Sequence, residues 1–141
     1  ALFENKMPEL LKKSPPGSYA FVQLNVRDFK LINTSGGRSA GDVALRHIYD
    51  HLFKNIASDE LVSRFNADLF CLLLHFKSED ALKSRLYRFY DHINAFNGIA
   101  EKKYLFRFNE GVYVIDDPEL DSEIIFERAN LARKRKDKNN T

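Results

Sequence analysis

The spacing of hydrophobic positions changes several times along the chain, and each change marks an expected element. Apolar residues recur at helical spacing over residues 2–13, and the Ser-Pro-Pro-Gly turn at 14–17 ends that helix. Aromatic and β-branched side chains in residues 18–26 favour a strand. A short helix that stops before a Gly-rich break is predicted over 29–32, and a longer helix with one apolar stripe over 40–56.

Strand-like and helical spacing alternate again in the second half of the chain. The expected elements are a hairpin with strands 59–65 and 69–76, a helix over 78–97, one or two strands within 103–115, and a last helix over 122–136. Gly111 interrupts the alternation of the third of these stretches, which predicts a kink there.

The expected order after the N-terminal helix is β-α-α-β-β-α-β-α. Strands interleaved with helices about a central hairpin predict an α+β fold with a ferredoxin-like core, in which helices flank a central antiparallel sheet. We expect residues 1–17 to form an N-terminal helix and linker, and residues 18–141 to form one domain. A length of 141 residues, of which 44% are hydrophobic, suits a single domain with a substantial core.

Charge and cysteine content exclude few classes of function. The net charge of +2 argues neither for nor against an anionic partner. We expect no nucleic acid to bind. Basic residues crowd into 133–138, as either a solvated helix end or a cationic wall facing phosphates. Cys71, the only cysteine, lies in an apolar strand and is expected in the core. No signal peptide or membrane-length apolar run is visible, so we expect a cytoplasmic domain whose parent protein could still be membrane-anchored.

Two motifs invite a chemical interpretation that their details do not support. His47 and His51 are one helical turn apart, but no third metal ligand is evident and Ile48 stands where the usual glutamate would be. The Gly-rich stretch 36–41 is followed by Asp42 and preceded by a helix, whereas a phosphate-binding Walker loop needs a Lys there and a strand before it. Neither motif is expected to be a site of its kind.

Three segments, in order and at matching spacing, resemble the GGDEF domain, the diguanylate cyclase fold of bacterial signalling. Residues 23–33 resemble the family pattern Asp-x-Asp-x-Phe-Lys-x-Ile-Asn at the end of the first strand. Residues 37–45 resemble Gly-His-x-x-Gly-Asp-x-x-Leu, and residues 61–70 stand in the place of the signature. The resemblance runs from about Tyr19 to Lys134 and implies a nucleotidyl-cyclase-type core, with residues 18–141 as a degenerate GGDEF domain.

The resemblance implies a site for a guanine nucleotide, GTP with Mg²⁺ in the family. Asn33 and Asp42 match the residues that read the guanine edge. An amide can pair with the guanine carbonyl or ring acceptor, and a carboxylate can accept from its N1–H and N2–H groups. Lys30 matches the lysine beside the phosphates, and Phe29 and Asp28 belong to the same phosphate-side loop.

The catalytic half of the implied site departs from the family. The metal positions are Asp68, Asn25 and Val26, and Asn25 replaces a metal-binding Asp, which removes one negative ligand. Arg27 replaces a second Asp and reverses its charge. The signature reads Asn66, Ala67, Asp68, Leu69 and Phe70, without the family's two glycines and glutamate. Because phosphoryl transfer depends on metal charge and positioned donors, we expect no diguanylate cyclase activity.

Two further family motifs are blurred. The window of the product-inhibition motif Arg-x-x-Asp reads Ala57-Ser58-Asp59-Glu60, so its arginine is absent and we expect no cyclic di-GMP to bind there. Lys134 and Lys136 are candidates for the phosphate-binding lysine of the last helix.

Three functions fit these residues. The first is a regulatory module that binds GTP and modulates an attached phosphodiesterase domain of the EAL type, or that serves a sensory neighbour. The second is a pure interaction scaffold with a vestigial site, for example a homodimerisation domain. The third is residual cyclase activity, for which Asp68 is the only acidic support.

Overall fold

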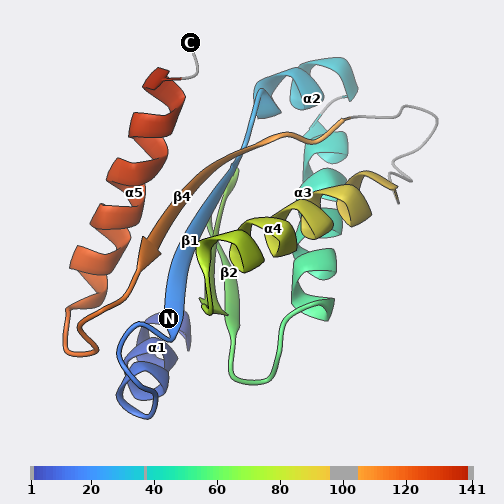
Figure 1. Cartoon of the computed structure of the whole chain (residues 1–141). Coiled ribbons are helices and arrows are strands. Elements are labelled where there is room, and N and C mark those ends of the chain that lie inside the picture. Colours follow the sequence, from blue (N-terminus) through green and yellow to red (C-terminus); the bar gives the residue numbers. More distant parts are fainter. Residues whose placement is uncertain (1, 37, 96–104, 140–141) are drawn as a thin grey trace.

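In a computed structural model, four strands form one antiparallel sheet (Figure 1). The model describes residues 2–36, 38–95 and 105–139, without the side chains of residues 2, 33, 35, 38, 39 and 136–139. The strands, β1 (Tyr19–Val26), β2 (Leu61–Asn66), β3 (Leu69–His75) and β4 (Phe108–Val114), lie in the order β2-β3-β1-β4. This order confirms the predicted ferredoxin-like α+β core.

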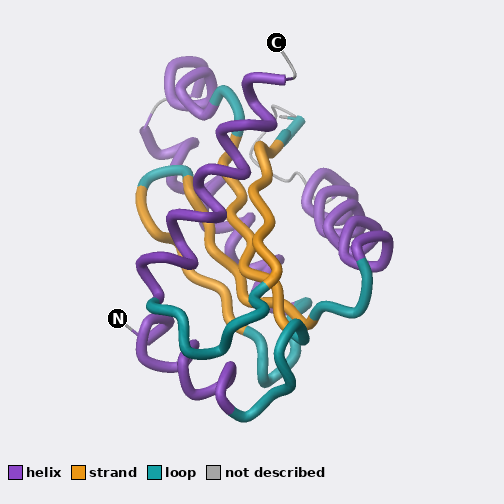
Figure 2. The backbone as a smooth tube through the Cα atoms, turned by 60° about the vertical axis from the view of Figure 1, so that its left-hand side comes forward, coloured by secondary structure: helices purple, strands orange, loops and turns teal. Residues whose placement is uncertain are grey.

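Helices cover both faces of the sheet, and the strands form the middle layer (Figure 2). One face carries α2 (Phe29–Gly36), α3 (Arg38–Lys54) and α4 (Glu79–Ala95), and the other carries α1 (Leu2–Lys12) and α5 (Ser122–Asn139). None of these helices, within the ranges described, is long and apolar enough to cross a membrane.

Side chains of the two central strands alternate between the two helical layers. Val22, Leu24 and Leu72 pack with α3 and α4, whereas Phe21 and Leu73 pack with α1 and α5. Because both faces are covered, β3 is a nearly continuous apolar run, and β1 is apolar except for Gln23 and Asn25.

Cys71 belongs to the core, as its place in an apolar strand predicts. The side chain is buried in the layer beneath α1 and α5. Burial raises the pKa of the Cys71 thiol to about 12, against a smaller lowering by the charge of Arg133. The thiol is therefore neutral at physiological pH and its role is packing.

The predicted kink at Gly111 is wrong. The register between β1 and β4 runs without a break from the pair Ala20–Val114 to the pair Val26–Phe108. A Cβ atom at Gly111 would lie 2.2 Å from the carbonyl oxygen of Ala129 and 2.6 Å from Cβ of Arg133. The glycine lets α5 approach the strand closely, which is a packing requirement and not a bend.

Helix boundaries follow local capping groups. The hydroxyl of Ser78, where the helix was predicted to begin, accepts a hydrogen bond from the N–H of Ala81 at 3.1 Å and caps α4. The short helix predicted over 29–32 continues to Gly36, and within it the hydroxyl of Thr34 donates to the carbonyl of Lys30 at 2.8 Å. The predicted strand residues 103 and 104, and the predicted helix residues 96 and 97, lie outside the described residues.

Candidate nucleotide site

The end of β1 is tied to the turn of the β2–β3 hairpin. The carbonyl of Asp68 accepts hydrogen bonds from the backbone N–H of Val26 at 2.9 Å and from Nδ2 of Asn25 at 3.4 Å. Asn25 also pairs with Leu69 in the sheet register. The fold thus brings together the three positions predicted for a metal, Asn25, Val26 and Asp68.

The segment after Val26 turns sharply into α2. Asp28 has a φ of 54°, the left-handed conformation that Asp tolerates better than most residues, and its carbonyl accepts from the N–H of Leu31 at 2.9 Å. Phe29 begins α2 and packs partly against the core. The turn therefore sets the direction of α2 and leaves the Asp28 side chain exposed.

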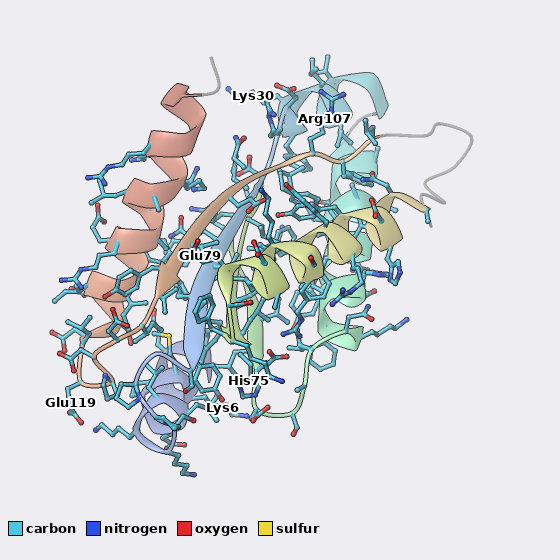
Figure 3. All side chains as sticks on the ribbon, viewed as in Figure 1. Lys6, Lys30, His75, Glu79, Arg107 and Glu119 are labelled. Carbon is cyan, nitrogen blue, oxygen red and sulfur yellow. The ribbon has the colours of Figure 1, made fainter. Side chains whose placement is uncertain are left out.

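Three basic residues belong to this end of the sheet. The backbone N–H of Arg27 donates to the carbonyl of Arg107 at 2.8 Å, which joins the end of β1 to the segment before β4. Figure 3 shows Lys30, from α2, and Arg107 at the same end of the molecule. Arg27, Lys30 and Arg107 are all exposed, so this end can offer positive charge to an anion.

The residues at the predicted metal positions do not fit a Mg²⁺ site. Among Asn25, Val26 and Asp68 only Asp68 supplies a carboxylate, and the Asn25 side chain offers at most a neutral amide oxygen. Arg27 adds a positive charge to the same turn. Mg²⁺ prefers anionic oxygen ligands in octahedral geometry, which this set does not offer. Over the described part of the chain, no three His, Cys, Asp or Glu side chains are grouped to hold a metal ion.

The histidines of α3 have a neighbour that the sequence did not reveal. The ring of His51 lies 5.6 Å from the ring of His92, which belongs to α4, and 6.3 Å from the ring of His47. Burial lowers the pKa of His51, and the nearby His92, His47 and Lys54 lower it further. Nε2 of His47 lies 2.9 Å from the carbonyl of Ile93, so this histidine ties α3 to α4.

Asp42 opens onto a hollow between α3 and β2. The hollow has a volume of about 460 Å³, and its lining includes Asp42, Arg46 and Tyr49 from α3 and Arg64 from β2. Asn33 lies in the neighbouring α2, which packs against α3, but its side chain is outside the described residues. The pairing of Asn33 with Asp42 around a guanine stays a prediction.

The signature segment forms a tight hairpin turn with an irregular register. Asn66 pairs with Leu69, and a β-bulge falls between Arg64 and Asn66. Asp28 is the one residue other than glycine with positive φ in the described ranges, so Asn66 does not adopt the left-handed conformation and the turn does not rely on it. Nη1 of Arg64 donates to the carbonyl of Ala67 at 3.4 Å.

The hairpin also decides which signature side chains meet solvent. Asn66 and Ala67 are exposed and Asp68 is partly buried, whereas Leu69 is only 6% exposed and Phe70 is fully buried. The position of the family's glutamate is therefore occupied by a core leucine, which holds no charge and accepts no proton.

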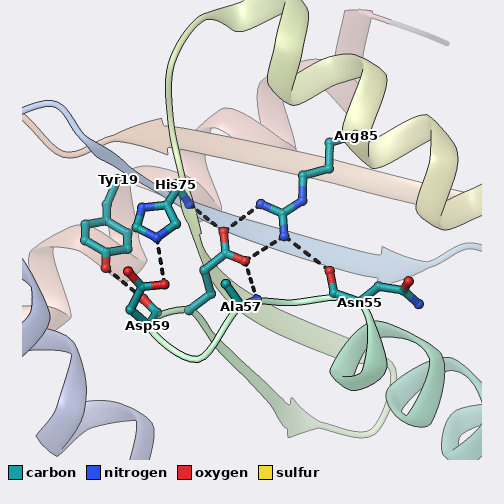
Figure 4. A network of polar contacts seen from close by, with 7 residues as sticks. Tyr19, Asn55, Ala57, Asp59, His75 and Arg85 are labelled. Carbon is teal, nitrogen blue, oxygen red and sulfur yellow. Dashed lines mark hydrogen bonds and ion pairs between the residues drawn. The ribbon is translucent and has the colours of Figure 1, made fainter.

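A polar network that the sequence did not reveal orders the loop before β2 (Figure 4). Glu60 accepts hydrogen bonds from the N–H groups of Ala57 and His75, both at 2.8 Å. It also accepts from both terminal nitrogens of Arg85 at 2.6 Å, while Arg85 further donates to the carbonyl of Asn55 at 3.3 Å. No local motif marks this pair, because its members are 25 residues apart and meet only in the fold.

The same network sets the ionisation of Glu60. Burial by itself raises the pKa of its carboxyl group, whose side chain is 1% exposed. The hydrogen bonds from Arg85, Ala57 and His75 and the charge of Arg85 outweigh burial, so the net pKa lies below its ordinary value. Glu60 is therefore a structural anion that fixes the loop in the place of the family's product-inhibition motif.

The sequence matches the family described as "Diguanylate cyclase, GGDEF domain" over residues 1–141. Because the match covers the whole chain, the chain belongs to this family and is a GGDEF domain of cyclic di-GMP signalling.

One curated relative is a protein of Escherichia coli (strain K12) described as "Probable diguanylate cyclase DgcE". It is 26% identical over 135 residues, which are 94% of this chain and 12% of the relative. The chain thus spans about an eighth of that protein's length.

Solved structures support the fold. The diguanylate cyclase SiaD of Pseudomonas aeruginosa, in complex with its activator SiaC, has a TM-score of 0.80 at 20% identity over 98% of this chain and 54% of that one. The GGDEF domain of DgcB from Caulobacter crescentus, in complex with c-di-GMP, has a TM-score of 0.80 at 14% identity, over 98% and 81%. An EAL/GGDEF domain protein of M. capsulatus has a TM-score of 0.62 at 21% identity, over 95% and 91%.

Proposed function

We propose that this domain is a regulatory module that binds a guanine nucleotide, forms no cyclic di-GMP, and adjusts the activity of an attached EAL-type phosphodiesterase or sensory domain. The observation that carries the proposal is the asymmetry of the two halves of the site. Asp42 opens onto the hollow beside α3, whereas the three positions predicted for a metal at the end of β1 offer one carboxylate, that of Asp68, beside the positive Arg27.

The binding half supplies the chemistry that a guanine nucleotide needs. The exposed carboxylate of Asp42 can accept from guanine N1–H and N2–H, and Asn33 is the amide expected to complete the base edge. Arg27, Lys30 and Arg107 offer cations to the phosphates at the end of β1. Arginine is always charged and pairs with two phosphate oxygens at once, so binding does not require a metal ion to neutralise them.

The catalytic half lacks what phosphoryl transfer requires. The reaction needs charge stabilisation at the transferred phosphoryl group and an aligned attacking oxygen. Asp68 is the single anionic residue at the three metal positions, and the buried Leu69 replaces the acid of the signature. A nucleotide held by Asp42 would therefore remain uncleaved and serve as a signal.

A titration with labelled GTP, with Mg²⁺ and with EDTA, tests the proposal. We expect saturable binding in both conditions, with dissociation constants that differ by less than about tenfold. Asp42→Ala should weaken binding by about tenfold or more, because the guanine N–H groups lose a charged acceptor. Asp91→Ala, which removes an exposed carboxylate from α4, is the matched control and should bind normally. Absence of saturable binding in both conditions refutes the nucleotide function.

An EAL/GGDEF domain protein among the similar structures supports the choice of neighbour. In the full-length parent protein, GTP should change the phosphodiesterase rate, and Asp42→Ala should abolish that change. A parent activity that responds to GTP equally in the wild type and in Asp42→Ala would instead favour a scaffold with a vestigial site.

A further inference from the structure

Strand β2 leaves one edge of the sheet open. It pairs with β3 on one side and is the last strand of the sheet on the other. Within the described ranges, the backbone hydrogen bonds of Leu61–Arg64 run to β3 alone. A regular strand edge carries a row of backbone donors and acceptors that can pair with another extended chain.

This edge is the floor of a groove with a wall on each side. The groove has a volume of about 760 Å³ and is lined along its floor by Leu61–Arg64. One wall comes from α1 and the other from α3 and the loop after it, which belong to opposite layers of the fold. An added strand would therefore lie between two helical walls, as the strands inside the sheet do.

Side chains of β2 already alternate between those walls. Leu61 packs with the core beneath α1 and α5, and Val62 packs with the core beneath α3 and α4. Ser63 lines a second hollow with Phe3 of α1, and Arg64 lines both that hollow and the one beside Asp42. A paired segment would follow the same alternation, so successive side chains would meet α1 and α3 in turn.

The two walls differ in chemistry. The α3 wall is apolar, with Tyr49 and Ile56 beside Phe53, whose side chain is 59% exposed. The α1 wall is mixed: Phe3 and Leu10 are apolar, and Lys6 and Lys13 leave a net positive charge against Glu9. A complementary segment would place apolar side chains against the α3 wall and acidic ones against α1.

The length of the edge is also limited. The β-bulge between Arg64 and Asn66 breaks the regular register and ends the usable edge at Arg64. Bulges are one means by which proteins stop further pairing at an edge. The open part thus coincides with the floor of the groove, Leu61–Arg64.

We propose that Leu61–Arg64 binds an extended peptide segment of a partner as a fifth strand, and that this segment alternates apolar and acidic side chains. The apolar residues contact Phe53 and Ile56, and the acidic residues contact Lys6 and Lys13. This surface is separate from the turn at the end of β1, and its occupant needs no nucleotide.

Selection from a displayed library of random peptides of about eight residues, a common strand length, tests the proposal. We expect enriched peptides to alternate apolar and acidic residues and to shift the amide resonances of Leu61–Arg64 in the labelled domain. Two versions of the best peptide, methylated at the odd or at the even backbone nitrogens, give the next test. Only one version should lose binding, because only one of the two sets of N–H groups donates to the β2 edge.

Variants distinguish specific binding in the groove from non-specific binding to exposed apolar residues. Phe53→Glu should weaken the best peptide by about tenfold or more, and Lys6→Glu should reduce the preference for acidic residues. Leu131→Glu, at another exposed apolar residue on α5, is the matched control and should bind normally. The proposal fails if no peptide is enriched, if binding is insensitive to Phe53→Glu, or if sedimentation shows a dimer in which a second copy occupies the β2 edge.

Discussion

At the scale of single residues, the buried charge of Glu60 is stabilised by partners that are mostly distant in the sequence. Glu60 is buried, yet four hydrogen bonds and the charge of Arg85 keep it ionised. A buried carboxylate without these partners would carry a large desolvation cost. By contrast, the pair of Asp59 and His75, joined at 2.8 Å, is about half exposed and contributes little.

Removal of the Arg85 charge should therefore destabilise the domain strongly. Arg85→Met keeps the apolar stem and leaves Glu60 buried without its cation, so we expect a loss of about 3–5 kcal/mol in urea unfolding at pH 7. Asp59→Asn, in the exposed pair, is the control and should cost less than about 1 kcal/mol.

The pH dependence follows from the direction of the Glu60 shift. Its folded pKa lies below the ordinary value of 4.5, so its contribution is present above pH 4.5 and is lost as pH falls through the lower folded value. The difference in the free energy of unfolding between wild type and Arg85→Met should therefore shrink over that acid range. A gap that stays constant from neutral pH to below this range would contradict the assignment.

At the scale of elements, the close contact of α5 with β4 and β1 organises one side of the sheet. Gly111 gives the helix backbone room to approach. Beside it, the buried Gln23 donates to the carbonyl of Phe126 at 3.1 Å and accepts from Nε of Arg133 at 3.1 Å. The amide thus satisfies a polar position inside the helix–sheet interface, where an unpaired group would be costly.

A methyl group at Gly111 should separate these elements. Gly111→Ala places Cβ 2.2 Å from a backbone oxygen that cannot rotate away, so α5 has to shift. We expect a loss of about 3 kcal/mol, near the upper end of ordinary overpacking, measured by thermal or urea unfolding. Stability equal to wild type would mean that α5 does not lie this close to β4.

At the scale of the whole molecule, the fold separates the turn at the end of β1 from two neighbouring hollows beside β2. The end of β1 carries the exposed Arg27, Lys30 and Arg107, and the hollow with Asp42 lies between α3 and β2. The groove along β2 lies between α1 and α3. The hollow and the groove share Tyr49 and Arg64, whereas neither is lined by the turn at the end of β1. Catalysis can therefore be lost while nucleotide and peptide binding are kept.

Catalysis is the function that we expect to be lost. Incubation of the domain with GTP and either Mg²⁺ or Mn²⁺, followed by chromatography, should yield no cyclic di-GMP. The physical reason is that Asp68 is the single carboxylate at the three predicted metal positions and that Leu69, in the place of the signature acid, lies in the core. Product that accumulates with time and enzyme concentration would establish residual cyclase activity instead.

Element types and their order were predictable because local patterns carry them. The hairpin, the α3 stripe and the cap at Ser78 all appear in the structure where periodicity and capping chemistry indicate. Gly111 was misread because a glycine in a strand can mark either a bend or a close approach, and only the position of α5 distinguishes them. The pairing of Glu60 with Arg85 and the contact of His92 with His51 join distant residues, so no local pattern could reveal them.

The sequence by itself determined the fold class, the family and the residues that replace its catalytic acids, because these depend on residue type at fixed spacing. The tertiary structure decided how those residues are used. It put Leu69 in the core, turned the Asn25 amide toward the Asp68 carbonyl, and set β2 at an edge between two helical walls. Such outcomes depend on which distant backbone and side-chain groups meet, and that is settled only when the sheet and its two layers pack together.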